Sequence, residues 1–299
     1  MSIDIRNLSY TYMKGSPYEK TALNNITLRI EKGEFVAIIG RTGSGKSTLV
    51  QHLNGILKPS FGKVLINGED TKGKNLRELR KHVGMVFQYP EYQLFEETVY
   101  KDIAFGLKKL GLGEKEMDDR IHEISEIVGL SPESLQKSPF ELSGGQKRRA
   151  AIAGVLVMKP GILVLDEPAA GLDPVGRKEI FSFINGLYRD TGITIVFVSH
   201  NMEDVARLAK RIIVLEKGSV FLDGSSKEIF SDIERLENAG LAAPQITYLM
   251  RRLKEYVPEI NATQFTVEGA KQEIMKYLNK DLNKVFDKDL NKGGAAATC

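Results

Sequence analysis

The feature that most constrains this chain is a glycine-rich loop between an apolar strand and a helix. Residues Phe35–Ile39 are predicted to form the strand, and the loop that follows reads Gly40, Arg41, Thr42, Gly43, Ser44, Gly45, Lys46, Ser47 and Thr48. This is GxxxxGK followed by Ser, a pattern in which backbone N–H groups surround phosphate oxygens at the positive end of a helix. The sequence therefore predicts a nucleotide site, with Lys46 on the phosphates and the Ser47 hydroxyl on Mg²⁺.

Two carboxylates follow another apolar strand. Residues Ile162–Leu165 form a continuous apolar run, as do Ile193–Val198, which is typical of parallel strands covered by helices on both faces. Ligands bind at the carboxyl ends of such strands, where Asp166 and Glu167 lie. Asp166 can hold Mg²⁺ through water. Glu167 suits the role of a base or water-orienting group, because a carboxylate beside the γ-phosphate would repel ATP in the ground state.

A second glycine-rich helix start lies at Leu142–Gln146. Ser143 is a good N-cap for a helix over roughly 147–158, and two glycines leave backbone N–H groups uncovered. No second lysine accompanies this motif, so its geometry would make sense if it contacted a nucleotide held by another subunit. The basic pair Arg148 and Arg149 is expected on a solvated face of this helix.

These motifs, in this order, resemble those of the ATP-binding cassette (ABC) ATPases, whose signature LSGGQ stands here at 142–146. The resemblance covers about residues 3–225. It implies an α/β P-loop NTPase fold with a RecA-like core, an antiparallel β subdomain and an inserted helical subdomain. It also implies that one set of residues acts on ATP held by a partner subunit: Ser143, Gly144, Gly145, Gln146 and, in the D-loop, Asp173.

The family resemblance assigns the remaining site residues. Gln88 matches the Q-loop glutamine, which in the family touches Mg²⁺ and the attacking water. His200 matches the switch histidine that contacts the γ-phosphate, and the whole set implies ATP hydrolysis with Glu167, Gln88 and His200 as catalytic residues. Tyr12 matches the aromatic residue that stacks on adenine, although Tyr10 or Tyr18 could take that place.

A narrower resemblance lies at residues 86–106, VFQYPEYQLFEETVYKDIAFG. It is similar to the ATPases of energy-coupling factor (ECF) transporters, the vitamin and cobalt/nickel importers of prokaryotes, and residues 223–245 resemble the C-terminal extension of their second ATPase type. This implies a second ATPase subunit, a transmembrane coupling protein contacted near Tyr89–Phe105, and a substrate-binding membrane protein contacted indirectly. From packing alone, most aromatic side chains of this segment are expected in the core of the helical subdomain, with one or two facing the partner: Tyr89, Tyr92, Phe95, Tyr100 and Phe105.

The expected organisation has four parts. Residues 1–88 and 159–224 form the core with its β subdomain, 89–158 the helical subdomain with the signature, 225–284 a helical extension, and 285–299 a disordered tail. Within 89–158, apolar residues recur three or four apart between Lys115 and Val128, which predicts an amphipathic helix.

Composition limits the remaining possibilities. The 299 residues carry a net charge of +3, too little to predict binding to nucleic acid or an anionic membrane. There is no transmembrane run or signal peptide, and the single Cys299 excludes a disulfide framework, so we expect a peripheral protein on the cytoplasmic face of the cell membrane. Two alternatives stay open: the ATPase of another importer class, and a cassette acting on DNA or ribosomes. The partner ATPase can be an identical or a related chain.

Overall fold

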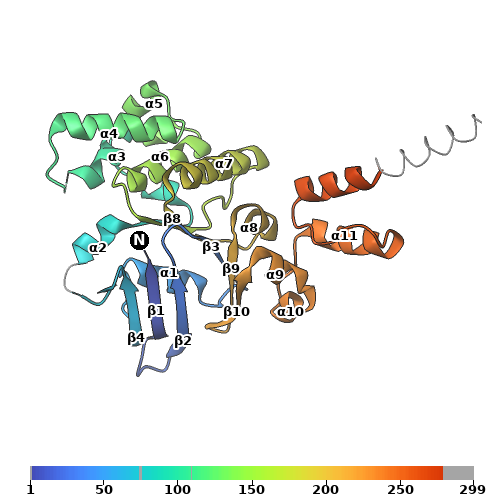
Figure 1. Cartoon of the computed structure of the whole chain (residues 1–299). Helices are drawn as coiled ribbons and strands as arrows, with labels where there is room; N and C mark the ends of the chain where they lie inside the picture. The colour runs from blue at the N-terminus through green and yellow to red at the C-terminus, as the bar shows by residue number, and fades with distance from the viewer. Residues whose placement is uncertain (1, 74–75, 109, 279–299) are drawn as a thin grey trace, which may run out of the picture. The chain divides into compact units, whose positions relative to one another are not determined.

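The computed structural model describes residues 2–73, 76–108 and 110–278 and is shown in Figure 1. The chain divides into two compact units. The first comprises Met1–His200 with Leu208–Gly224, and the second comprises Asn201–Arg207 with Ser225–Cys299. The predicted site residues all belong to the first unit.

A four-stranded antiparallel sheet forms one layer of the first unit. Its strand order is β2 (Lys20–Ile30), β1 (Ile3–Tyr12), β4 (Phe61–Ile66) and β5 (Glu69–Asp70). Ile3 pairs with Ile30 on one side and with Ile66 on the other. Buried and exposed residues alternate along the second half of β2, so one face of this sheet packs on the core and the other meets solvent.

A six-stranded sheet forms the second layer. Its order is β10 (Ser219–Ser225), β9 (Arg211–Glu216), β3 (Phe35–Ile39), β8 (Thr194–Val198), β7 (Ile162–Asp166) and β6 (Val83–Val86). The pairs from β9 to β6 are all parallel, and every residue of β3, β8, β7 and β6 is buried. The predicted parallel strands are confirmed, and the chain segments that leave β3, β7 and β8 emerge at one edge of the sheet.

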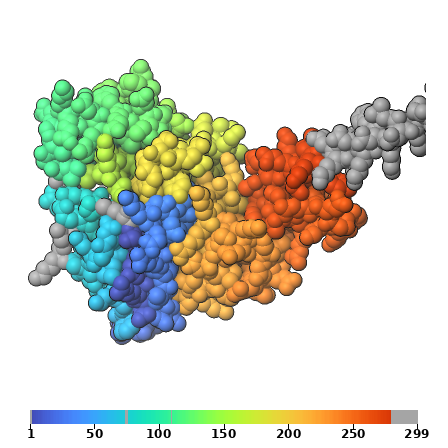
Figure 2. All heavy atoms as spheres, viewed as in Figure 1, coloured from blue at the N-terminus to red at the C-terminus, as the bar shows by residue number. Residues whose placement is uncertain are grey.

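Helices complete the first unit. They are α1 (Lys46–Leu53), α2 (Leu76–His82), α3 (Val99–Leu107), α4 (Glu114–Ile127), α5 (Pro132–Gln136), α6 (Gly144–Leu156) and α7 (Pro174–Thr191), with the 3₁₀ turns η1 (Pro90–Gln93) and η2 (Pro139–Glu141). Helices α3 to α6 gather in one cluster, drawn in green in Figures 1 and 2. The predicted amphipathic helix is α4, which buries Ile121 and Ile124.

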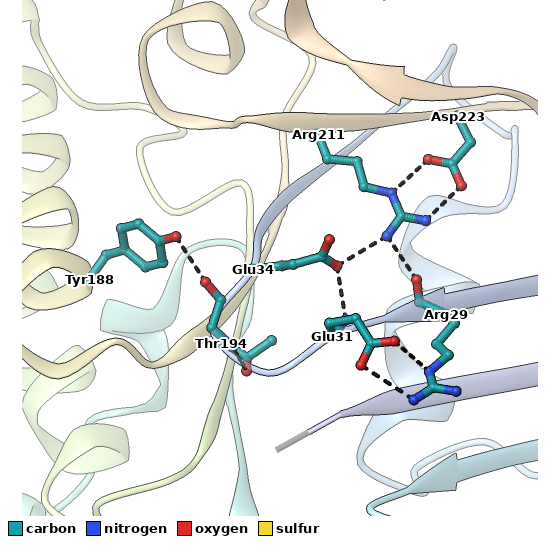
Figure 3. Close-up of polar contacts among 8 residues, drawn as sticks. Arg29, Glu31, Glu34, Tyr188, Thr194, Arg211 and Asp223 are labelled. Carbon is teal, nitrogen blue, oxygen red and sulfur yellow. Dashed lines mark hydrogen bonds and ion pairs between the residues drawn. The ribbon is translucent and has the colours of Figure 1, made fainter.

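Polar contacts link the start of β3 to the neighbouring strands, as Figure 3 shows. The Arg211 guanidinium donates two hydrogen bonds to the Asp223 carboxylate, each of 2.8 Å. Its third nitrogen, Nη1, donates to the Arg29 carbonyl at 2.8 Å and to Glu34 at 3.0 Å. One side chain of β9 therefore joins β10, the end of β2 and the residue before β3, at the opposite end of β3 from the glycine-rich loop.

The second unit is helical. It contains most of α8 (Met202–Leu208), then α9 (Ser226–Ser231), α10 (Ile233–Asn238), α11 (Gln245–Tyr256) and a helical stretch at 267–278. Met250, Ile260 and Ala270 form a small buried cluster within it. Residues 279–284 of the expected extension and the expected tail at 285–299 lie outside the described residues.

The expectation that Arg148 and Arg149 share a solvated face is wrong for Arg148, which is only 1% exposed. Arg148 stands on the inward face of α6, four and eight residues before the buried Ile152 and Leu156. Residues spaced in this way lie on one side of a helix. Arg149 is turned by one residue from that face and stays partly exposed, with an ion pair to Glu179.

The expectation that the aromatic residues after Gln88 are mostly core is also wrong. Tyr92 is 83% exposed and Phe95 63%, and Tyr89 and Phe105 are exposed as well. The interior positions of this segment are taken by the aliphatic residues of α3, namely Val99, Ile103, Ala104 and Leu107. The aromatic rings are left to cover the surface, where Phe95 and Phe105 meet edge to face with centroids 5.0 Å apart.

Candidate nucleotide site

A cavity of about 790 Å³ lies at the edge of the six-stranded sheet where β3, β7 and β8 end. Most of the residues predicted to bind nucleotide line it, together with several that were not predicted. The lining residues are Tyr12, Met13, Tyr18, Lys20, Ala22, Gly40, Thr42, Gly43, Gly45, Lys46, Ser47, Thr48, Gln88, Glu167 and His200.

Glycine is required where the loop turns into α1. Gly45 precedes the helix with φ of 103°, in the left-handed region that residues with a side chain avoid. A Cβ at Gly45 would also lie 2.7 Å from the carbonyl oxygen of Ala22. The loop is therefore pressed against β2 with its backbone exposed toward the cavity, which suits the binding of phosphate oxygens by N–H groups.

Lys46 reaches back across the loop. Its Nζ donates to the carbonyl oxygens of Gly40 at 2.7 Å and Arg41 at 3.0 Å. Burial lowers the pKa of Lys46, and the negative charges of Glu167 and Asp166 oppose that effect. The Ser44 hydroxyl oxygen is buried and has no hydrogen-bond partner among the described residues. Lys46 thus places a cation on the cavity wall, where an anionic ligand would supply an acceptor, whereas Ser44 is not among the residues that line the cavity.

Asp166 ends β7 and lies beside the start of α1. Burial raises the pKa of Asp166, and the hydrogen bond from the Ser47 hydroxyl to its carboxylate opposes that effect only in part. A buried carboxylate with a raised pKa gains from a nearby cation. The predicted metal ligands Ser47 and Asp166 are therefore in contact.

Glu167 stands between the two other predicted catalytic residues. The side-chain amide of Gln88 donates to one Glu167 carboxylate oxygen at 3.1 Å, and Nδ1 of His200 lies 3.1 Å from the other. Glu167 has a φ of 50°, which is rare for a residue with a side chain. Its backbone N–H donates to the Val198 carbonyl at 3.0 Å. Strained backbone of this kind is concentrated at functional sites.

The three candidate tyrosines for adenine lie in different surroundings. The Tyr12 hydroxyl is 3.1 Å from the hydroxyl of Thr48, and both Tyr12 and Tyr18 line the cavity. Tyr10 instead packs against the core and meets the buried His52 ring at 4.9 Å. Three residues that were not predicted from the sequence also line the cavity, beside these tyrosines on β1, β2 and the segment that connects them: Met13, Lys20 and Ala22.

The signature residues form a separate surface. Ser143 caps α6, which begins at Gly144, three residues before the expected start. The Ser143 hydroxyl accepts from the N–H of Gln146 at 3.3 Å, and the Gln146 side chain accepts from the N–H of Ser143 at 3.0 Å. A Cβ added to Gly144 or Gly145 would meet nothing within 4 Å. Among the described residues that line the cavity, none comes from this motif.

Asp173 likewise lies outside the cavity lining and caps a helix. Its carboxylate accepts from the N–H of Gly176 at 2.8 Å at the start of α7. The structure thus brings the loop, Asp166, Glu167, Gln88 and His200 together. It leaves the five residues expected to act on a partner's nucleotide outside that group: Ser143, Gly144, Gly145, Gln146 and Asp173.

Comparison with known proteins identifies the family. Residues 23–170 match the model of the ABC transporter family. The chain is 58% identical to the energy-coupling factor transporter ATP-binding protein EcfA2 of Acetivibrio thermocellus over 94% of its own length and 100% of that protein. It is 55% identical to the protein of the same name from Clostridium tetani, over 93% of this chain and 98% of the relative.

Solved structures agree with the sequence relatives. CbiO1 of Clostridium perfringens, part of the ABC transporter complex CbiONQ, aligns with a TM-score of 0.71 and 37% identity over 86% of this chain and 96% of CbiO1. A dimeric ATP-binding cassette in a post-hydrolysis state with ADP and Pi aligns with a TM-score of 0.67 and 31% identity, over 75% of this chain and 98% of the cassette.

These relatives favour the transporter reading over a cassette that acts on DNA or ribosomes. Within the described residues, no helix is both long enough and apolar enough to cross a bilayer. The fold is that of an ABC ATPase, with the expected mixture of parallel and antiparallel sheets. The chain therefore belongs to the ATP-binding proteins of energy-coupling factor transporters, which are ABC ATPases that bind and hydrolyse ATP.

Proposed function

We propose that this chain binds Mg·ATP in the cavity described above and hydrolyses it with its own Glu167, Gln88 and His200. The observation that carries this proposal is the Glu167 carboxylate, which Gln88 and His200 hold from two sides at 3.1 Å each. Phosphoryl transfer to water needs charge neutralisation and a placed nucleophile more than covalent chemistry. Glu167 and Gln88 would place the water, and His200 and Lys46 would neutralise the γ-phosphate.

The side chains present fit Mg²⁺. Among the described residues, no three His, Cys, Asp or Glu side chains gather as they would around a metal held by protein alone. Mg²⁺ in nucleotide sites is instead bound by one or two protein oxygens plus phosphates and waters. The Ser47 hydroxyl and the buried Asp166 carboxylate are already in contact and would hold it, and Gln88 lines the same cavity as Ser47. When bound, the ion would supply positive charge that offsets the negative charge of the phosphates.

The composite site requires a second cassette. We infer that Ser143, Gly144, Gly145, Gln146 and Asp173 act on ATP in the partner subunit, because they lie outside the cavity of their own chain. Two uncovered glycines at the start of α6 present N–H groups and the positive end of a helix, which suits a phosphate. The partner is an identical chain or a related ATPase.

We further propose that the exposed aromatic residues of Tyr89–Phe105 contact a transmembrane coupling protein. Soluble surfaces rarely expose several large aromatic rings together unless a partner covers them. Residues 89–158 would then act as the helical subdomain and 225–284 as the extension. The chain would work on the cytoplasmic face of the membrane, and a separate membrane protein would bind the substrate, a vitamin or a transition-metal ion.

The test of the catalytic assignment is Glu167→Gln. This change keeps the shape and one oxygen for Gln88, but it removes the charge that polarises water. Hydrolysis should fall by at least ~10²-fold, as for the loss of one group that stabilises a transition state. ATP should still bind, and the ATP-bound dimer should accumulate.

Glu123→Gln is the matched control, because Glu123 is an exposed carboxylate on α4 that pairs with Lys159. Its ATPase rate should equal that of the parent. A parental rate in Glu167→Gln, with the same melting temperature as the control, would refute the assignment.

A further inference from the structure

Arg148 is a buried cation that the proposed mechanism does not use. It is 1% exposed, among the largest fully buried side chains of the described chain. A buried charge is costly unless it is paired and its donors are satisfied. The hydrogen-bond partners of Arg148 therefore indicate the role of this side chain.

One guanidinium makes four hydrogen bonds to two other segments. Its Nε and Nη2 donate to the two carboxylate oxygens of Glu91, at 3.0 and 2.6 Å. Its Nη1 donates to the backbone carbonyls of Pro168 at 3.0 Å and Ala170 at 2.7 Å. A paired fork of this kind fixes geometry as well as charge.

The two segments are those that continue from the water-positioning pair. Glu91 lies in η1, three residues after Gln88, and Pro168 follows Glu167 directly. Gln88 in turn donates to Glu167 at 3.1 Å. The contacts form a closed path that runs from Gln88 to Glu167, through Pro168 to Arg148, and through Glu91 back to Gln88.

Glu167 needs such support. Its left-handed φ of 50° persists only when the surroundings fix it. Ala170 donates its N–H to the Glu167 carbonyl at 3.0 Å, so the carbonyls that Arg148 holds belong to the same turn. Tyr89 also lies against this turn, since a Cβ at Gly171 would meet its ring at 3.2 Å.

We propose that Arg148 is a positioning residue for ATP hydrolysis. Its guanidinium holds the segment after Gln88 against the turn after Glu167, and it thereby keeps the two side chains in register when ATP is bound. Because Arg148 stands on α6, five residues after Ser143, the helix that begins with the signature also fixes these two segments. The proposal rests on the roles of Glu167 and Gln88 proposed above.

Arg148→Met is the principal test, in the full chain within the ATPase dimer that it forms. We expect kcat to fall by about 10- to 100-fold, as when a reacting group is displaced by about 1 Å. The affinity for ATP should stay within about twofold, because no contact to the nucleotide is removed. Hydrogen exchange should become faster in peptides that cover residues 88–93 and 167–173.

Arg211→Met is the matched control. Arg211 also grips a carboxylate with two bonds and donates to a second carboxylate and a backbone carbonyl, but it lies at the opposite end of β3 (Figure 3). This variant should lower the melting temperature and leave kcat, and exchange in 88–93 and 167–173, at parental values. It separates general destabilisation from positioning.

Two variants keep the test decisive. Arg148→Lys retains the charge but not the fork, so its kcat should lie between those of the parent and Arg148→Met. Glu91→Gln combined with Arg148→Met removes the unpaired carboxylate. The double variant should stay as slow as Arg148→Met, because the link itself is missing. Recovery of kcat in the double variant would show that the defect was only an unpaired charge and would overturn the proposal.

Other outcomes are equally clear. A folded Arg148→Met protein with parental kcat would reduce Arg148 to a structural residue. Should Arg148→Met fail to fold, parental kcat in both Arg148→Lys and Glu91→Gln would have the same meaning. Glu167→Gln is measured alongside: parental hydrolysis there refutes the proposed catalytic role, whereas an inactive Glu167→Gln beside a parental Arg148→Met refutes the positioning role alone.

Discussion

The separation of Lys46 from Ser143 within one chain leads to a quantitative prediction for mixed dimers. Lys46 lines the nucleotide cavity, whereas Ser143 caps α6 outside it. We consider two variants, Lys46→Ala and Ser143→Arg. If the signature acts across the interface, each homodimer has two damaged sites and should be inactive. In a mixed dimer both defects fall on the same site, and the other site is intact.

The expected activity follows from the two-fold symmetry of a homodimer. Random exchange of equal amounts gives about half mixed dimers, each with one intact site of two, so the mixture should recover about a quarter of the parental rate. Mixed dimers isolated with two different affinity tags should recover about half. If the loop and the signature acted within one chain, every mixed dimer would carry one defect in each site and would recover nothing.

A second mixed dimer serves as the reciprocal control, because the two arrangements of the site predict opposite outcomes in it. The double variant, with Lys46→Ala and Ser143→Arg in one chain, is paired with the parental chain. Across an interface, both sites are then damaged and the dimer should be inactive. Measured ATPase near half the parental rate in this dimer, with none in the first mixture, would refute the composite site.

Three further predictions concern the partner surface, acid stability and adenine. Tyr92→Asp should weaken assembly with the membrane partner but spare ATP binding, because a charge in an apolar contact is costly; normal co-purification of a variant with a parental melting curve would exclude Tyr92 from that contact. Burial lowers the pKa of His52, so its imidazole stays neutral in the folded protein. Its contribution to the free energy of unfolding is therefore full above the unfolded-state pKa of about 6.5 and is lost as the pH falls below that value. Urea unfolding between pH 8 and 5 should show a steeper loss for the parent than for His52→Gln, and equal slopes would contradict this. Tyr12→Ala should weaken ATP binding by about 5- to 150-fold, which corresponds to the loss of one stacked base. The effect should exceed that of Tyr18→Ala, because the Tyr12 hydroxyl is held by the hydroxyl of Thr48. Parental affinity for ATP in binding titrations of Tyr12→Ala would exclude Tyr12 as the stacking ring.

The parts of the site that the sequence predicted are those whose chemistry is local. The loop at 40–48 needs glycines where a side chain would strike Ala22, and the strands before it and before Asp166 need unbroken apolar runs to be buried on both faces. Both requirements concern consecutive residues, so they can be recognised directly in the sequence. The contact between Ser47 and Asp166 then follows from the parallel order of β3, β8 and β7.

The role of Arg148 could not be read in the same way, because its partners are 57 and about 20 residues distant. One local signal was available: Arg148 shares a helical face with Ile152 and Leu156, which marks it as buried. The prediction that aromatic rings such as Tyr92 and Phe95 are mostly buried failed for the opposite reason. Hydrophobicity alone predicts that these rings are buried, but the aliphatic residues of α3 fill the interior positions of this segment.

The cap at the start of α6 has a consequence for the kinetics of dimer closure. A serine hydroxyl offers one hydrogen and two lone pairs, and the cap uses a lone pair of Ser143 to accept the N–H of Gln146. The hydrogen stays available for a phosphate oxygen. A γ-phosphate that reaches Ser143 can therefore be bound without breaking the cap. The start of α6 is already ordered before the two cassettes meet, so their association includes no free-energy cost for ordering it. On this basis, the barrier to closure should arise from bringing two cassettes together rather than from rebuilding the signature.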